Sequence, residues 1–114
     1  MLKKPYRLSR QKDFGRLKHS GRSFFCPAFR LRCLANNLVR SRFAVVVSTK
    51  ISKKAVVRNR LRRQILEIIR LNLDKIKPGN DFIIAVNQKA LGLTSAQLEH
   101  EFLSALKKNF FLVN

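Results

Sequence analysis

The segment KKAVVRNRLRRQILEIIR, residues 53–70, constrains the fold of this chain more than any other stretch. Its apolar residues recur with helical spacing, which predicts a helix from about residue 54 to residue 73. Four of them fall on one side of that helix and form a stripe that must be buried: Val57, Leu61, Ile65 and Ile68. We expect this stripe to pack against a sheet.

The same segment carries two polar rows outside the apolar stripe. Asn59, Arg63 and Arg70 lie within roughly 40 degrees of one another, and Arg58 and Arg62 form a second row along the edge of the stripe. Like charges four residues apart repel each other. Because a planar guanidinium can hold phosphate oxygens through two hydrogen bonds, the rows predict a phosphate-binding surface. An ordinary solvated helix face is the alternative.

Net charge points to the same kind of partner. The 114 residues contain 25 Lys and Arg against 6 Asp and Glu, a formal net charge of +19. Residues 1–63 hold 19 of the basic residues and one acid, Asp13. Self-repulsion of this size weakens a compact state, so a polyanion is the simplest counterpart, and nucleic acid is the commonest one. An anionic membrane and a merely solvated surface are the alternatives.

The N-terminal half has the pattern of a short helix followed by a strand. Ser9 can cap a helix over residues 10–19, and Gly21 can end it. Residues 24–35 alternate after Pro27 and are interpreted as one half-buried strand. The two faces of that strand carry Phe29, Leu31 and Cys33 on one side and Arg30 and Arg32 on the other.

Two more strands and a last helix follow. Asn36 and Asn37 have turn chemistry, so residues 42–50 are predicted to form a second strand that pairs with the first as a hairpin. This second strand is too uniformly apolar to have a wet face. Residues 81–88 are predicted as a third strand, which can lie parallel to the second across the long helix. Thr94 and Gln97 fit a capping box at the start of the last helix.

The aromatic residues divide between core and candidate base-stacking positions. Phe29 and Phe43 are expected in the core, because aromatics on strands are more often packed inside than used as platforms for bases. Phe14 lies in a short, glycine-containing helix among basic residues, and both readings stay open for it. Phe110 and Phe111 are expected to dock on the sheet.

Nothing in the sequence forms a recognisable catalytic or metal site. The six acids are dispersed, His19 and His100 are isolated, and no nucleophile stands beside a base. If residues 24–35 form one strand, Cys26 and Cys33 lie about 23 Å apart and cannot form a disulfide. Without a signal sequence or a long apolar run, the chain is predicted to be one cytoplasmic domain, residues 1–114, with reduced thiols.

Several motifs together resemble one known family. AVVRNRLRRQILE, with its arginine-asparagine-arginine signature, is similar to the helix of the bacterial ribonuclease P protein subunit. RLSRQKDFGRLKHSG resembles the first helix of that family, PAFRLRCL and RFAVVVSTK its strand pair, and GNDFIIAVNQKA the strand after its long helix. The resemblance covers nearly the whole chain.

This resemblance implies a fold as well as a family. It implies an α+β, two-layer α/β sandwich, in which a mixed central sheet of about four strands packs with three helices, like the second domain of a small-subunit ribosomal protein. It also implies a left-handed strand-helix-strand crossover, although general chirality rules favour the right-handed form.

The resemblance further implies a division of labour with RNA. A large RNA subunit would carry out Mg²⁺-dependent hydrolysis at the 5′ end of precursor tRNA, while the protein binds that RNA and the 5′ leader of the substrate. Its partners would be the catalytic RNA and precursor tRNA, with no membrane, no small-molecule substrate, no catalytic residue and no metal site of its own.

Two residue sets are carried over from the family. The RNA-subunit-binding set is Lys53, Lys54, Arg58, Asn59, Arg60, Arg62, Arg63 and Arg70. The leader-binding set is Phe14, Lys18, Arg30, Arg32, Ser48 and Lys50. Lys18 and Arg32 stand where many relatives have aromatic residues, and Lys53 and Lys54 stand where relatives often have Gly-Asn.

Two other function classes compete with this interpretation. One is a basic ribosomal or other structured-RNA-binding protein without a role in tRNA processing. The other is a membrane-active cationic protein, which would need an exposed helix with a wide apolar face. RNA binding should weaken steeply as salt rises, whereas membrane binding through apolar contacts should persist.

Overall fold

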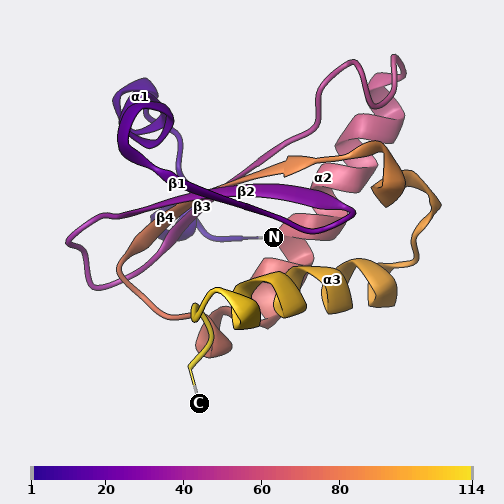
Figure 1. Cartoon of the computed structure of the whole chain (residues 1–114). Coiled ribbons are helices and arrows are strands. Elements are labelled where there is room, and N and C mark those ends of the chain that lie inside the picture. Colours follow the sequence, from indigo (N-terminus) through magenta and orange to yellow (C-terminus); the bar gives the residue numbers. More distant parts are fainter. Residues whose placement is uncertain (1, 114) are drawn as a thin grey trace.

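A four-stranded sheet runs through the middle of the protein, and three α-helices lie against it (Figure 1). The computed structural model describes residues 2–113. The α-helices and strands are α1 (Gln11–Ser20), β1 (Arg22–Phe25), β2 (Phe29–Ala35), β3 (Arg42–Val46), α2 (Ala55–Leu71), β4 (Asn80–Val86) and α3 (Ser95–Lys108). Short 3-10 helices occur as η1 (Lys4–Tyr6), η2 (Leu73–Lys75) and η3 (Gln88–Gly92).

The sheet is mixed and has the strand order β1-β2-β4-β3. The β1–β2 and β2–β4 pairs are antiparallel, and β3 and β4 are parallel. Parallel neighbours cannot be joined by a tight turn, so α2 crosses from the end of β3 to the start of β4. The predicted α+β class is confirmed, as is the parallel pairing across the long helix.

The prediction of one strand over residues 24–35 is wrong. The chain reverses at Pro27 and Ala28, where Cys26 and Phe29 exchange backbone hydrogen bonds of 2.9 and 3.3 Å. The result is a β1–β2 hairpin in which Phe25 pairs with Arg30. The expected separation of the two cysteines along one strand is therefore also wrong, although Cys26 and Cys33 are both free thiols.

The predicted hairpin between residues 24–35 and residues 42–50 is wrong too. β4 lies between β2 and β3, so β3 is an edge strand. Contrary to the prediction, β3 does have a wet side, because Val46 lies on the sheet face that α1 leaves uncovered and is 43% exposed. The N-terminal segment covers part of that edge, since the Leu8 N–H donates to the Phe43 carbonyl at 2.8 Å.

One face of the sheet forms the main core with α2 and α3. Phe43 and Phe82 stack there at 5.3 Å between ring centroids, and Phe29 meets Phe102 of α3 edge-on. Phe29 and Phe43 are thus core residues, as predicted. Phe111 also docks into this core, but Phe110 is 79% exposed with a positive φ, so its predicted docking is wrong.

Helix α2 buries the stripe that its periodicity predicts. Leu61, Ile65 and Ile68 are buried, Ile69 joins them, and Val57 is half-buried near the first turn. At the start of α3, Thr94 and Gln97 form the predicted capping box. The buried apolar side chains of α2 and α3 hold both helices on one side of the sheet.

Helix α1 packs on the opposite face of the sheet, away from α3 (Figure 1). Its N-cap is Arg10, not Ser9 as predicted, and no side chain caps it. Leu17 is buried beneath the helix, and Asp13 is buried beside Arg42 of β3. Gly21 ends the helix as predicted.

A charged cluster joins α1 to two strands. Arg42 donates from Nε and Nη2 to the Asp81 carboxylate at 2.8 and 2.7 Å, and its Nη1 lies 3.3 Å from Asp13 Oδ2. Asn36 adds a 2.9 Å hydrogen bond to Asp81. The hydrogen bonds to Asp81 raise the pKa of Arg42 further above its already high value. This arginine therefore serves the fold.

The two glycines around α1 give a matched test of this packing. A Cβ on Gly21 would lie 2.3 Å from the Leu17 carbonyl oxygen, whereas one on Gly15 would meet nothing within 4 Å. We predict that Gly21→Ala lowers the free energy of unfolding by about 2 kcal/mol, and that Gly15→Ala raises it by about 1 kcal/mol. Urea unfolding measures both. Equal effects of the two substitutions would contradict the tight helix end.

Candidate nucleic-acid interface

The solvent side of α2 presents most of the predicted RNA-subunit-binding set. Lys53 and Lys54 immediately precede the helix. The exposed members of the set are Lys53, Lys54, Asn59, Arg60, Arg63 and Arg70, while Arg58 and Arg62 are half-buried along the edge of the apolar stripe. The structure thus brings all eight residues to one helix and the loop before it, and their role in binding RNA stays a prediction.

Two of these arginines are held by local hydrogen bonds. Arg58 Nη1 donates to the Ser52 carbonyl at 2.9 Å, which ties the helix to the loop before it. Arg62 Nη1 donates to Asn59 Oδ1 at 2.8 Å. A guanidinium has five N–H donors, so both side chains keep donors for a ligand while their positions are fixed.

Arg70 differs from the other members of the set, because a carboxylate already meets its charge. Its Nε lies 3.0 Å from both oxygens of Glu67, one turn away. The guanidinium lowers the pKa of Glu67 through these hydrogen bonds, so the carboxylate is ionised at neutral pH. By contrast, no salt bridge within residues 2–113 reaches Arg60 or Arg63.

Arg60 and Arg63 border a hollow between α2 and the start of α3. Its volume is about 570 Å³, and its lining includes exposed Leu71 and the carboxylates of Glu67 and Glu99. The hollow therefore carries both signs of charge. The uncompensated positive charge lies on its Arg60 and Arg63 side.

The second candidate surface is the part of the sheet that α1 leaves uncovered. Side chains of paired residues share a face, which gives two rows across the four strands. The open row is Phe25, Arg30, Ala85 and Val46, and the second row is Ser23, Arg32, Ile83 and Ala44. The next row, with Leu34, Asp81 and Arg42, lies beside α1.

The predicted leader-binding residues lie around these rows. Arg30 is exposed in the open row, and Arg32 is half-buried in the second row. On α1, Phe14 is half-buried and Lys18 is exposed one turn later. Ser48 and Lys50 are exposed in the loop after β3, which leaves the sheet at the Val46 end of the open row. The arrangement groups the six residues around one face, and leader contact stays a prediction for each.

Two features of this face escaped the sequence interpretation. Phe25 is 69% exposed at the β1 end of the open row, with the Arg30 guanidinium 5.8 Å from its ring centroid. The turn at Pro27 was the available signal, since it sets the register that pairs the two residues. In addition, the buried Nε of Arg32 has no hydrogen-bond partner within the described chain.

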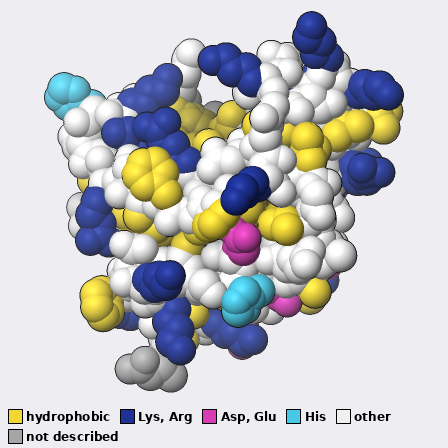
Figure 2. Space-filling view, turned by 45° about the vertical axis from the view of Figure 1, so that its right-hand side comes forward, with side chains coloured by type: hydrophobic (Ala, Val, Ile, Leu, Met, Phe, Trp, Pro, Cys, Tyr) yellow, Lys and Arg dark blue, Asp and Glu magenta, His cyan; other side chains and the backbone are white. Residues whose placement is uncertain are grey.

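The surface around these elements is dominated by cations. Figure 2 shows Lys and Arg side chains spread over the visible face, with few acids between them. Most acids are engaged within the fold, as Glu99 accepts from Asn72 and Glu101 from the Ala28 N–H. Such a field attracts phosphate groups in general.

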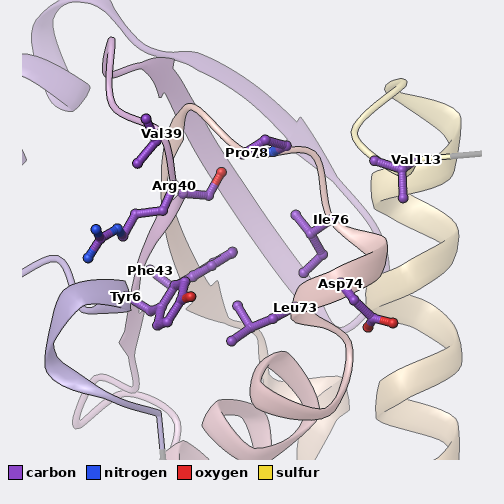
Figure 3. A pocket seen from close by; sticks show the side chains of 10 residues that line it. Tyr6, Val39, Arg40, Phe43, Leu73, Asp74, Ile76, Pro78 and Val113 are labelled. Carbon is purple, nitrogen blue, oxygen red and sulfur yellow. The ribbon is translucent and has the colours of Figure 1, made fainter.

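Another hollow lies away from both candidate surfaces and is mainly apolar. It has a volume of about 450 Å³ at the outer edge of β3, where Tyr6, Phe43, Leu73 and Ile76 point toward one another (Figure 3). Arg40 and Asp74 stand at its rim. No residue of the two predicted sets lines this hollow, so we do not assign it to nucleic acid.

The described residues hold no metal site or membrane-spanning helix. Within residues 2–113, no three His, Cys, Asp or Glu side chains come together as possible metal ligands. No helix in that part of the chain is both long and apolar enough to cross a membrane.

Comparison with known proteins gives a consistent result. A family model described as Ribonuclease P matches residues 2–109. The ribonuclease P protein component of Pelotomaculum thermopropionicum is 38% identical over 101 residues, 89% of each chain. That of Synechocystis is 39% identical over 92 residues, 80% of this chain and 74% of the relative.

Solved structures agree with the sequence relatives. A Staphylococcus aureus RNase P protein mutant with defective mRNA degradation activity superposes with a TM-score of 0.87 at 28% identity, over 95% of this chain and 91% of that one. The RNase P protein from Thermotoga maritima gives a TM-score of 0.83 at 28% identity, over 90% and 96%.

Two arginines of α2 give a test that separates binding from packing. We predict that Arg63→Ala leaves the free energy of unfolding unchanged, because its side chain is exposed, and that it lowers the salt slope of RNA binding by about one. Arg58→Ala should also lose about 1 kcal/mol of stability with its bond to Ser52. Urea unfolding and RNA titrations at several salt concentrations measure these effects. Loss of stability in Arg63→Ala would contradict the assignment.

Proposed function

This chain belongs to the ribonuclease P protein family, and on that premise we propose that it binds the catalytic RNA through α2 and the 5′ leader of precursor tRNA through the uncovered sheet face. A ribonuclease P protein component is part of a tRNA-processing ribonucleoprotein enzyme. In our proposal the holoenzyme removes the leader in the cytoplasm, and this chain supplies binding and orientation.

The observation that carries the proposal is the cationic surface of α2. Arg60 and Arg63 are exposed without a salt bridge in the described chain, while the apolar side of the same helix is packed into the core. The planar guanidinium of arginine can donate two hydrogen bonds to one phosphate, which suits the backbone of a folded RNA. The burial of the apolar stripe also removes the wide apolar face that an interfacial membrane helix would need.

The leader assignment rests on the shape and charge of the uncovered sheet face. Single-stranded RNA is commonly bound by a cationic groove with exposed rings that stack on its bases. Here Arg30 and Arg32 supply positive charge on the face, and Phe14 and Lys18 of α1 stand beside it. Lys50 extends the positive charge beyond β3.

The chemistry of cleavage belongs to the RNA in this proposal. Mg²⁺ prefers several oxygen ligands, and the described residues bring no three acidic, His or Cys side chains together to hold it. We propose that the RNA subunit holds the Mg²⁺ and performs the catalytic step. Its contribution is to neutralise phosphates and to align the substrate with the RNA subunit.

Reconstitution with the RNA subunit tests the proposal directly. We predict that the protein raises the rate of precursor-tRNA cleavage by the RNA at near-physiological magnesium and salt. The same reaction without protein is the control. No gain over RNA alone would reject the proposal and favour a structured-RNA-binding protein outside tRNA processing, which would instead co-purify with ribosomes.

Phe14 gives a second test, aimed at the leader. We predict that Phe14→Ala reduces the affinity of the holoenzyme for leader-bearing precursor about fivefold, since a stacked base is lost, and leaves mature tRNA binding unchanged. Phe14→Leu, which retains apolar packing of this half-buried side chain, should lose the same preference. Titrations of both tRNAs measure the ratio. Equal losses for precursor and mature tRNA would argue against a leader role.

A further inference from the structure

Phe25 is an exposed aromatic residue whose ring lies outside the hydrophobic core. Its neighbour Phe24 points to the opposite face, where it is 7% exposed and stacks on Phe111 at 5.6 Å between centroids. Phe25 is instead 69% exposed, although burying a phenylalanine ring stabilises a protein by about 2 kcal/mol. Its exposure leaves the ring available for contact with a ligand.

The ring is held in position by its partner across the hairpin. Phe25 and Arg30 are directly opposite in the β1–β2 pairing, and the guanidinium carbon lies 5.8 Å from the ring centroid. This cation–π contact restrains both side chains. Because the ring is still largely exposed, it and the planar guanidinium together offer a surface on which a nucleobase can stack.

The charges on this face suit a nucleic-acid backbone. Neither the open row nor the second row contains an acid, and Arg30 and Arg32 are their charged members. Arg32 is half-buried two residues further along the same strand and face, and it adds positive charge beside the open row.

The other side of Phe25 suits RNA less well. There Phe25 borders a hollow of about 290 Å³ against α3. Glu101 and Lys108 of α3 also line this hollow. The Glu101 carboxylate, which accepts from the Ala28 N–H at 3.0 Å, would repel phosphates. A nucleotide is therefore favoured on the Arg30 side of the ring.

From these contacts we infer that Phe25 and Arg30 form a base-stacking site for one nucleotide of the leader, at the β1 end of the open row. This inference rests on the proposed function. The open row spans three inter-strand spacings, about 14 Å. A single-stranded leader that crosses the row from Val46 to Phe25 passes over Arg30 and beside Arg32. In RRM domains, a four-stranded sheet stacks two or three bases on its aromatic side chains.

The test measures binding of fluorescent precursor tRNAs to the reconstituted holoenzyme. Phe25→Ala should weaken precursor binding about fivefold to tenfold and leave binding of mature tRNA unchanged. Phe25→Tyr retains the ring and should stay within about twofold of the wild type. Phe110→Ala is the matched control, because Phe110 is 79% exposed but lies after α3, outside both rows.

Abasic leader nucleotides identify stacking itself. Each leader position is replaced in turn by an abasic residue and tested with wild-type protein and with Phe25→Ala. At one position the abasic substitution should weaken wild-type binding about fivefold to tenfold and have no further effect in the variant. This non-additivity distinguishes stacking from a change in protein structure, and urea unfolding of Phe25→Ala checks the fold.

Two results would overturn the inference. One is an equal loss for precursor and mature tRNA in Phe25→Ala, and the other is full additivity at every abasic position. Either outcome leaves the proposed function intact if wild-type protein still stimulates cleavage by the RNA subunit. Failure of that stimulation rejects the proposed function itself, so the two failures are distinguishable.

Discussion

The parallel pairing of β3 with β4 is the constraint on which the rest of the architecture depends. It requires a crossover, and α2 makes that crossover along one face because its apolar stripe needs the sheet. Helix α1 takes the other face at the amino ends of the parallel pair, where Arg42 and Asp81 anchor it. The carboxyl ends stay uncovered, next to the loop that carries Ser48 and Lys50.

The second constraint is electrostatic. The chain has few acidic residues, and most of them form salt bridges or hydrogen bonds within the fold. Asp13 and Asp81 hold Arg42, Glu67 holds Arg70, and Glu99 and Glu101 accept hydrogen bonds from neighbouring elements. The remaining cations of α2 and of the uncovered sheet face have little compensation within the described chain. A folded state with this much like charge gains stability when a polyanion binds it.

How much of this could be predicted from sequence depended on the range of the interactions. Helix α2, strand β4 and the Thr94 cap follow from local periodicity and short hydrogen bonds, and all three were predictable. Strand order was not, because alternation identifies the buried face of a strand but not its neighbour. The insertion of β4 between β2 and β3 comes from contacts distant in the chain.

The same distinction applies to the site. Helical spacing places Arg58 and Arg62 on one row, but their bonds to Ser52 and Asn59 depend on side-chain conformations that spacing does not specify. Phe24 and Phe25 are adjacent and identical in type, and only the register of the β1–β2 hairpin decides which is core and which is exposed.

The attachment of α1 to the sheet has one more consequence, since Asp13 and Leu17 are its buried residues. Local opening costs least where little apolar surface is buried, so we expect α1 to open at a lower free-energy cost than the sheet or the α2–α3 layer. A strand bound across α1 and the sheet would then act as a brace, and amide hydrogens of α1 would exchange more slowly in its presence.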